Sequence, residues 1–135
     1  MTLRWYTVVV DCRDVHAQAH WWAQTLGWPV VFEADDEAVI VPPAIAENPG
    51  AQTLQDWLAL GQGMVFVPVP ESKTIKNRLH IDLAPHTSQD RAAEIADLES
   101  RGARRVDVGQ TREETWTVLA DPEGNEFCVL SSRNR

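Results

Sequence analysis

The segment Asp121-Pro-Glu-Gly-Asn-Glu-Phe-Cys-Val-Leu130 joins a tight turn to the start of a strand. Pro122 presets φ at the second turn position, and Asp121 before it can bond its own backbone, so these residues predict a type I turn. Beyond the turn, successive side chains alternate between the two faces of a strand. One face carries Glu126, Cys128 and Leu130, and the other carries Phe127 and Val129.

The same order of signals occurs twice along the chain. Each half predicts a strand, a helix and three further strands. In the first half these are residues 4–11, 14–26, 28–33, 38–41 and 64–69, and in the second half 78–84, 90–101, 104–108, 115–120 and 126–131. The pattern therefore predicts two βαβββ modules.

No Gly/Ser-rich linker separates the halves, so residues 1–135 are expected to form a single domain. Module one spans 1–70, the linker about 71–77, and module two 78–132. Each module alone would bury little apolar surface. The expected fold class is α+β, with both modules in one curved eight-stranded mixed sheet and helices on the outside.

Capping residues place the helix ends. Asp14 is expected to cap the first helix, which Gly27 ends, and Ser88 to cap the second. Trp21 and Trp22 are adjacent on the first helix. Only Trp22 continues its apolar stripe, so Trp21 is expected at the edge or in a subunit contact.

Composition excludes several classes of protein. The 135 residues carry a formal net charge of −8, which disfavours nucleic acid as a partner. No run of ~18 apolar residues is present, so no membrane span is predicted. Two cysteines are too few for a disulfide framework, and together with the lack of a signal-peptide pattern they favour the cytoplasm.

Several short motifs occur together in a specific order: Val8–Asp14, Leu26-Gly-Trp28, Val67–Lys73, Lys76–Asp82, Gly102-Ala103 and Asp121–Glu126. This series resembles the vicinal oxygen chelate superfamily, and in particular its glyoxalase-like domain proteins. The superfamily includes glyoxalase I, extradiol dioxygenases and bleomycin-binding proteins. The resemblance implies the paired-module fold, a concave ligand cup, and a homodimer.

The resemblance also implies four metal-ligand positions, on the first and last strand of each module. They fall at Thr7, Val67, His80 and Cys128. Thr is a poor ligand, Val cannot ligate, and one His with one Cys leaves a divalent ion short of ligands. No metal or other cofactor is therefore expected, although Zn, Ni or Fe stays an alternative.

Other candidate ligand-binding residues are Trp57, Asp82, Trp116 and Glu126. His80 and Asp82 share one face of a strand, so His80 is a candidate general base or polar anchor, or else a structural histidine. Glu126 shares a face with Cys128, and it either reaches the cup or is solvated. Trp57 lies in the long segment 42–63, which is either a lid over the cup or an outer crossover.

Two functions stay open at this point. The first is a metal-independent small-molecule-binding protein, with an apolar or aromatic ligand against Trp57 and Trp116. The second is a glyoxalase-like lyase or isomerase that uses His80 with Glu126 or Asp82 as acid and base. The two histidines and one carboxylate of an Fe(II) dioxygenase are not evident, which makes that activity less expected.

Overall fold

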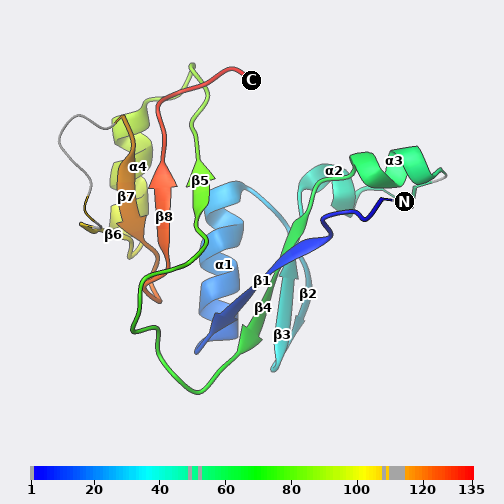
Figure 1. The fold of residues 1–135 in the computed structure, drawn as a ribbon, viewed down its shortest axis with the longest axis horizontal. Coiled ribbons are helices and arrows are strands. Elements are labelled where there is room, and N and C mark those ends of the chain that lie inside the picture. Colours follow the sequence, from blue (N-terminus) through cyan, green and yellow to red (C-terminus); the bar gives the residue numbers. More distant parts are fainter. Residues whose placement is uncertain (1, 49, 52, 108, 110–114) are drawn as a thin grey trace. The chain divides into compact units, whose positions relative to one another are not determined.

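The computed structural model describes residues 2–48, 50–51, 53–107, 109 and 115–135. It divides into two compact units, unit 1 (Met1–Ser72) and unit 2 (Lys73–Arg135). Each unit contains a four-stranded mixed sheet and at least one helix (Figure 1). The predicted α+β class and the two βαβββ modules are confirmed. The boundary between the units falls within the predicted linker.

Unit 1 contains one four-stranded sheet whose strand order is β1-β4-β3-β2. Its elements are β1 (Thr7–Cys12), α1 (Val15–Leu26), β2 (Val30–Ala34), β3 (Glu37–Ile40), α2 (Pro43–Ala46), α3 (Leu54–Ala59) and β4 (Gly63–Pro68). β1 pairs with β4 in parallel, while β3 pairs with β4 and with β2 in antiparallel fashion. The helix α1 contacts β2, β3 and β4.

The ends of α1 follow the predicted caps. The Asp14 carboxylate accepts a hydrogen bond from the Ala17 amide at 3.0 Å, and Gly27 ends the helix with φ 67°. That positive φ is strained for residues with a side chain. Trp21 and Trp22 are both buried, with their rings edge to face at 5.1 Å. The expectation that Trp21 lies at the edge is wrong, because the buried stripe of α1 is wide enough for both rings.

Two exposed histidines of α1 share one carboxylate. His16 Nδ1 and His20 Nε2 lie 2.7 and 2.9 Å from Oε1 of Glu33 on β2. The hydrogen bond to Glu33 raises the pKa of His16 above its usual value. The hydrogen bonds from His16 and then His20 hold the pKa of Glu33 below its usual value.

Unit 2 contains the second four-stranded sheet, whose strand order is β5-β8-β7-β6. Its elements are β5 (Ile81–Leu83), α4 (Arg91–Ser100), β6 (Arg104–Arg105), β7 (Thr117–Ala120) and β8 (Glu126–Val129). β5 and β8 are parallel, and β6–β7 and β7–β8 are antiparallel. The strands lie within the predicted ranges but are shorter, and Val108, predicted to end a strand, lies outside the described residues.

The N-cap of α4 lies two residues after the predicted one. It is Asp90, whose Oδ1 accepts hydrogen bonds from the amides of Ala92 and Ala93 at 3.0 and 3.2 Å. Ser88 instead bonds His86 Nδ1 through its hydroxyl at 2.7 Å. The Ser88 prediction is wrong because a carboxylate two residues closer to the helix accepts from two of its first amides at once.

The predicted turn before β8 is present, and its first residue, Asp121, is buried. The Gly124 amide donates to the carbonyl of Asp121 at 2.9 Å. The Asp121 side chain is 1% exposed and accepts from the amides of Glu123 and Asn125, each at 3.0 Å. Asp121 therefore fixes the direction in which β8 leaves the turn.

The two modules do not share one hydrogen-bonded sheet in the residues that the structure describes. Every strand ladder joins strands of the same unit, which gives two four-stranded sheets rather than one of eight strands. The parallel pairs β1–β4 and β5–β8 account for this, because each joins the first and last strands of one module. Among the described residues, no helix has the length and apolar character needed to cross a bilayer.

Candidate functional site

A pocket of about 320 Å³ opens on the sheet of unit 2. Its lining residues come from β5, β7, β8 and the residues beside them: Lys76, His80, Asp82, Trp116, Val118, Glu126, Phe127, Cys128 and Leu130. Five of the eight residues predicted for the site are among them. The pocket lies at the low end of the range typical of small-molecule sites.

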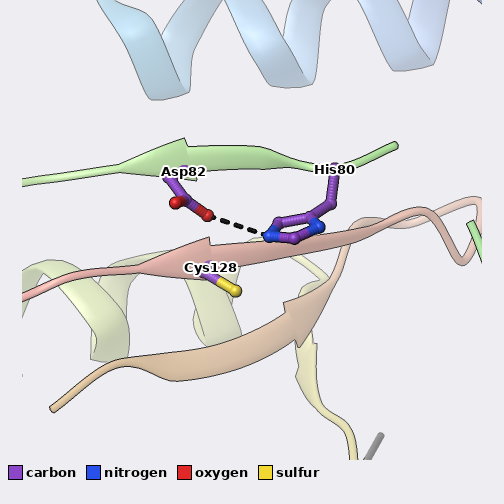
Figure 2. Close-up of side chains that lie close together, drawn as sticks. All are labelled: His80, Asp82 and Cys128. Carbon is purple, nitrogen blue, oxygen red and sulfur yellow. Dashed lines mark ion pairs between the residues drawn. The ribbon is translucent and has the colours of Figure 1, made fainter. Parts of the chain in front are cut away.

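Strand pairing brings the polar residues of the pocket together. Asp82 pairs with Cys128 across the parallel β5–β8 ladder, and Cys128 pairs with Val118 across β7–β8. Directly paired residues project from the same face of a sheet, as do residues two apart on one strand. His80 lies directly before β5, and its side chain contacts that of Asp82. Figure 2 shows the side chains of Asp82 on β5, Cys128 on β8 and His80 next to β5 close together.

His80 and Asp82 form an ion pair when the histidine is charged. His80 Nε2 lies 3.1 Å from Asp82 Oδ1, and the two side chains are 47% and 48% exposed (Figure 2). The carboxylate fixes the ring and leaves Nδ1 to meet a ligand. This arrangement of a histidine oriented by an aspartate is typical of general bases, and it is equally suited to anchoring a polar ligand group.

Cys128 is buried beside this pair as a free thiol. Burial raises the pKa of the Cys128 thiol, and the Asp82 carboxylate raises it further. The protonated thiol is a poor nucleophile, because the thiolate is the reactive form. In the protein without a metal, Cys128 is a small buried side chain at the base of the polar cluster.

Glu126 lies at the pocket but is held by other residues. Its Oε2 lies 3.0 Å from Lys73 Nζ and accepts a hydrogen bond from the Asn77 amide at 3.1 Å. Burial raises the pKa of Glu126, but Lys73 and the backbone hydrogen bonds outweigh it and leave that pKa below its usual value. An ionised carboxylate held in this way through Oε2 is a weak base and no proton donor near neutral pH. The side chain is only 12% exposed, so the expectation that it is solvated is wrong.

An apolar wall completes the pocket. Trp116, Val118, Phe127 and Leu130 contribute to it, and Trp116 stays 40% exposed. The alternation of β8 puts Leu130 on the Cys128 face, so this residue could have been found from the sequence. Phe127 belongs to the opposite face by the same alternation, and no sequence signal pointed to it.

Three predicted site residues lie in unit 1 and are not part of this pocket. Thr7 pairs with Gly63, whereas Val67 pairs with Asp11 at the other end of the same ladder. The Thr7 hydroxyl donates to the carbonyl of Val8 at 3.4 Å. These two positions are therefore not brought together within unit 1.

Trp57, the third of these residues, packs against the start of the chain. The Arg4 guanidinium lies 5.2 Å from the centre of the Trp57 ring and donates to the carbonyl of Gly61 at 2.8 Å. These contacts tie α3 and the residues after it to the segment before β1. They are the contacts expected of an outer crossover.

The polar cluster contains suitable ligands for a divalent metal. One ligand atom from each of His80, Asp82 and Cys128 lies within 4.8 Å of the other two. Imidazole nitrogen, carboxylate oxygen and thiolate sulfur are the ligand types of zinc. The sequence-based expectation of no metal considered only His80 and Cys128 as usable ligands, and the structure adds Asp82 to them.

A scan against known families matches the glyoxalase-like domain over residues 7–130. The chain therefore belongs to the glyoxalase-like domain family. A search of curated proteins found no significant match.

Solved structures share the fold over nearly the whole chain. A glyoxalase/bleomycin resistance protein/dioxygenase family enzyme from Burkholderia phytofirmans has a TM-score of 0.68 at 14% identity, with 97% of this chain and 100% of that chain covered. The fosfomycin resistance protein FosX from Listeria monocytogenes, in complex with Mn(II) and a dihydroxypropylphosphonic acid, has a TM-score of 0.67 at 9% identity, with coverage of 98% and 93%. Protein ATC0852 from Agrobacterium tumefaciens has a TM-score of 0.61 at 14% identity, with coverage of 99% and 100%. At these identities the similarity establishes the fold alone.

Proposed function

We propose that this glyoxalase-like protein binds a small organic molecule in the pocket of unit 2. The observation that carries the proposal is the convergence of His80, Asp82 and Cys128 beside the exposed ring of Trp116 in one cavity of about 320 Å³. Ligand sites typically combine an apolar wall with a few polar groups that fix orientation. The pocket has both parts.

The lining indicates the kind of ligand. Trp116, Val118 and Leu130 favour a flat or aliphatic body, because apolar contact is the main attraction available there. His80 can bond a hydroxyl, carbonyl or acidic group of the ligand, and the ammonium of Lys76 favours an acidic one. The small volume limits the ligand to about the size of a single ring with short substituents.

Tryptophan fluorescence tests this proposal. A panel of small aromatic and aliphatic acids, alcohols and ketones is titrated into the protein. We expect a saturable change that disappears in Trp116→Phe and weakens in His80→Ala. Trp57→Phe is the matched control, because Trp57 lies in unit 1 and contacts Arg4. A response that Trp57→Phe abolishes and Trp116→Phe leaves intact would place the ligand elsewhere.

A second candidate function is a lyase or isomerase that moves a proton. The 3.1 Å contact of His80 Nε2 with Asp82 favours it, because the carboxylate stabilises the imidazolium formed when Nδ1 takes a proton. Glu126 is not needed for this role, since Lys73 and Asn77 already hold its carboxylate.

Hydrogen exchange in heavy water tests the second candidate. Any compound found by fluorescence is incubated with the protein in D₂O, and its C–H signals are followed by NMR. Catalysed loss of one signal, absent in His80→Ala and slowed in Asp82→Asn, supports proton abstraction. Binding of a compound without loss of any C–H signal would support the binding function and contradict the lyase or isomerase.

We further propose a homodimer in a reducing compartment such as the cytoplasm. Cys12 and Cys128 are both thiols rather than members of a disulfide, and such a compartment keeps thiols reduced. Sedimentation equilibrium tests the dimer, and a single monomeric species at micromolar concentration would refute it.

A further inference from the structure

We propose that His80, Asp82 and Cys128 bind a zinc ion at the base of the unit 2 pocket, with one coordination position open to a ligand. Three ligand atoms from these side chains lie within 4.8 Å of one another. This inference deepens the proposed function in one respect, since the open position faces the pocket proposed to bind a small molecule.

Paired strands hold two of the three ligands, and the third directly precedes one of these strands. Asp82 and Cys128 are direct partners in the β5–β8 ladder, and His80 is the residue before the first residue of β5 (Figure 2). Sites built on paired strands keep their geometry better than sites built on loops. Cys128 is buried, whereas the side chains of His80 and Asp82 are half-exposed and have room to adjust when an ion binds.

The distances are close to those of a zinc site. Tetrahedral zinc with bonds of about 2.0–2.3 Å keeps its ligand atoms roughly 3.3–3.8 Å apart. His80 Nε2 and Asp82 Oδ1 are already 3.1 Å apart, and no pair in the group exceeds 4.8 Å. Side-chain rotations that move single atoms by about 1 Å would complete the site. Zinc would then replace the direct contact between His80 and Asp82.

The ligand types select the metal. A thiolate and an imidazole favour zinc over magnesium, calcium or manganese, which prefer oxygen ligands. The negative charges of the Asp82 carboxylate and the Cys128 thiolate balance one divalent ion. Three protein ligands leave a fourth position for water or a ligand group, which is the arrangement of zinc sites that act on ligands rather than closed structural sites.

The proposed ligand set differs from the one that the family resemblance implies. That set draws on both modules and would require Thr7 and Val67, which are unsuitable ligands. The proposed set lies within unit 2 and uses Asp82 as its third ligand. Metal binding should therefore be independent of the Thr7 and Val67 side chains.

Cobalt substitution provides a direct test. Chelator-treated full-length protein is titrated with Co²⁺, and the sulfur-to-cobalt charge-transfer band is followed in the near ultraviolet. We expect a band that saturates at one ion per chain and is displaced by Zn²⁺. The band should vanish in Cys128→Ser and persist in Cys12→Ser, the matched control, since Cys12 is equally buried but lies in unit 1.

Competition of Zn²⁺ with a chromophoric chelator tests the other two ligands. We expect His80→Ala and Asp82→Asn to weaken zinc binding by at least roughly 10- to 100-fold, the range seen when groups that only orient a ligand are lost. His86→Ala is the control histidine variant and should bind zinc as the wild type does. Asp82→Asn is isosteric and exposed, and circular dichroism establishes that each variant is folded.

The outcomes separate the two proposals. Absence of the cobalt band in the wild type, or a band that survives Cys128→Ser, overturns the zinc site. Wild-type zinc affinity in Asp82→Asn overturns the three-ligand set. If chelator-treated protein still gives a Trp116-dependent response to small molecules, only the zinc inference fails. If zinc binds but no compound perturbs Trp116, the zinc site stands and the binding proposal fails.

Discussion

Replacement of Asp121 by alanine is expected to lower the free energy of unfolding by about 3 kcal/mol, because two hydrogen bonds to a charged acceptor are lost at roughly 1.5 kcal/mol each. The carboxylate is 1% exposed and accepts from the amides of Glu123 and Asn125, each at 3.0 Å. Alanine supplies no acceptor for these amides.

The matched control is Asp90→Ala. Asp90 also accepts from two backbone amides, at 3.0 and 3.2 Å, but it lies at an exposed helix start. Solvent can replace those bonds, so the expected cost is about 1 kcal/mol, as for other N-cap residues. Because both residues accept from two backbone amides, the difference between the two stability losses measures the effect of burial rather than of the number of hydrogen bonds.

Urea unfolding followed by circular dichroism and by tryptophan fluorescence measures both variants. Coincident transitions with unchanged slopes permit a two-state treatment. The thermal midpoint of Asp121→Ala should fall by roughly 10 °C. A loss below about 1 kcal/mol, or one equal to that of Asp90→Ala, would show that the turn does not depend on this buried carboxylate.

Three further predictions concern other contacts. The stability difference between wild type and His16→Ala should be largest from pH 4.5 to 6.5. In this range both groups of the pair are charged, because His16 loses its charge only above its raised pKa and Glu33 is protonated only below its lowered pKa. Thermal melts across pH measure this difference, and a difference that does not depend on pH contradicts the pairing. Lys73→Met should lower the free energy of unfolding by about 1–2 kcal/mol near pH 7, because the Glu126 carboxylate loses one of its partners. That cost should disappear in acid once Glu126 is protonated, below a pKa already lower than 4.5, and urea unfolding at both pH values checks it. Gly27→Ala should lower the free energy of unfolding by about 1 kcal/mol, because alanine is strained at the φ of 67° found there. An unchanged urea midpoint would show that alanine is not strained at this position.

Local chemistry in the sequence was sufficient to place many elements. The caps Asp14 and Gly27 bound α1 as predicted, because each acts on backbone groups within a few residues. The turn at Asp121 follows from Pro and Gly at fixed offsets. Alternation with His80 predicted Asp82 as a candidate, the family resemblance implied Cys128, and the structure brings the two together in one pocket.

The sequence was insufficient where the answer depends on distant partners. Glu126 is held by Lys73 and Asn77, which come from a connecting segment without periodicity, so neither face alternation nor propensity could reveal the contact. Ser88 and Asp90 are both good capping residues, and only the path of the chain selects between them. The pairing of first with last strand within each unit likewise depends on tertiary structure.

The parallel pairing of β5 with β8 has a consequence for folding. The antiparallel ladders β6–β7 and β7–β8 join strands that are neighbours in sequence, whereas β5 must wait for α4 and two strands before it meets β8. Closing such a long loop is slow compared with forming hairpins. We therefore expect His80 and Asp82 to meet Cys128 in a late step of folding. A nascent or partly unfolded chain would lack the complete cluster. A ligand of this pocket would therefore bind only chains in which unit 2 is fully folded.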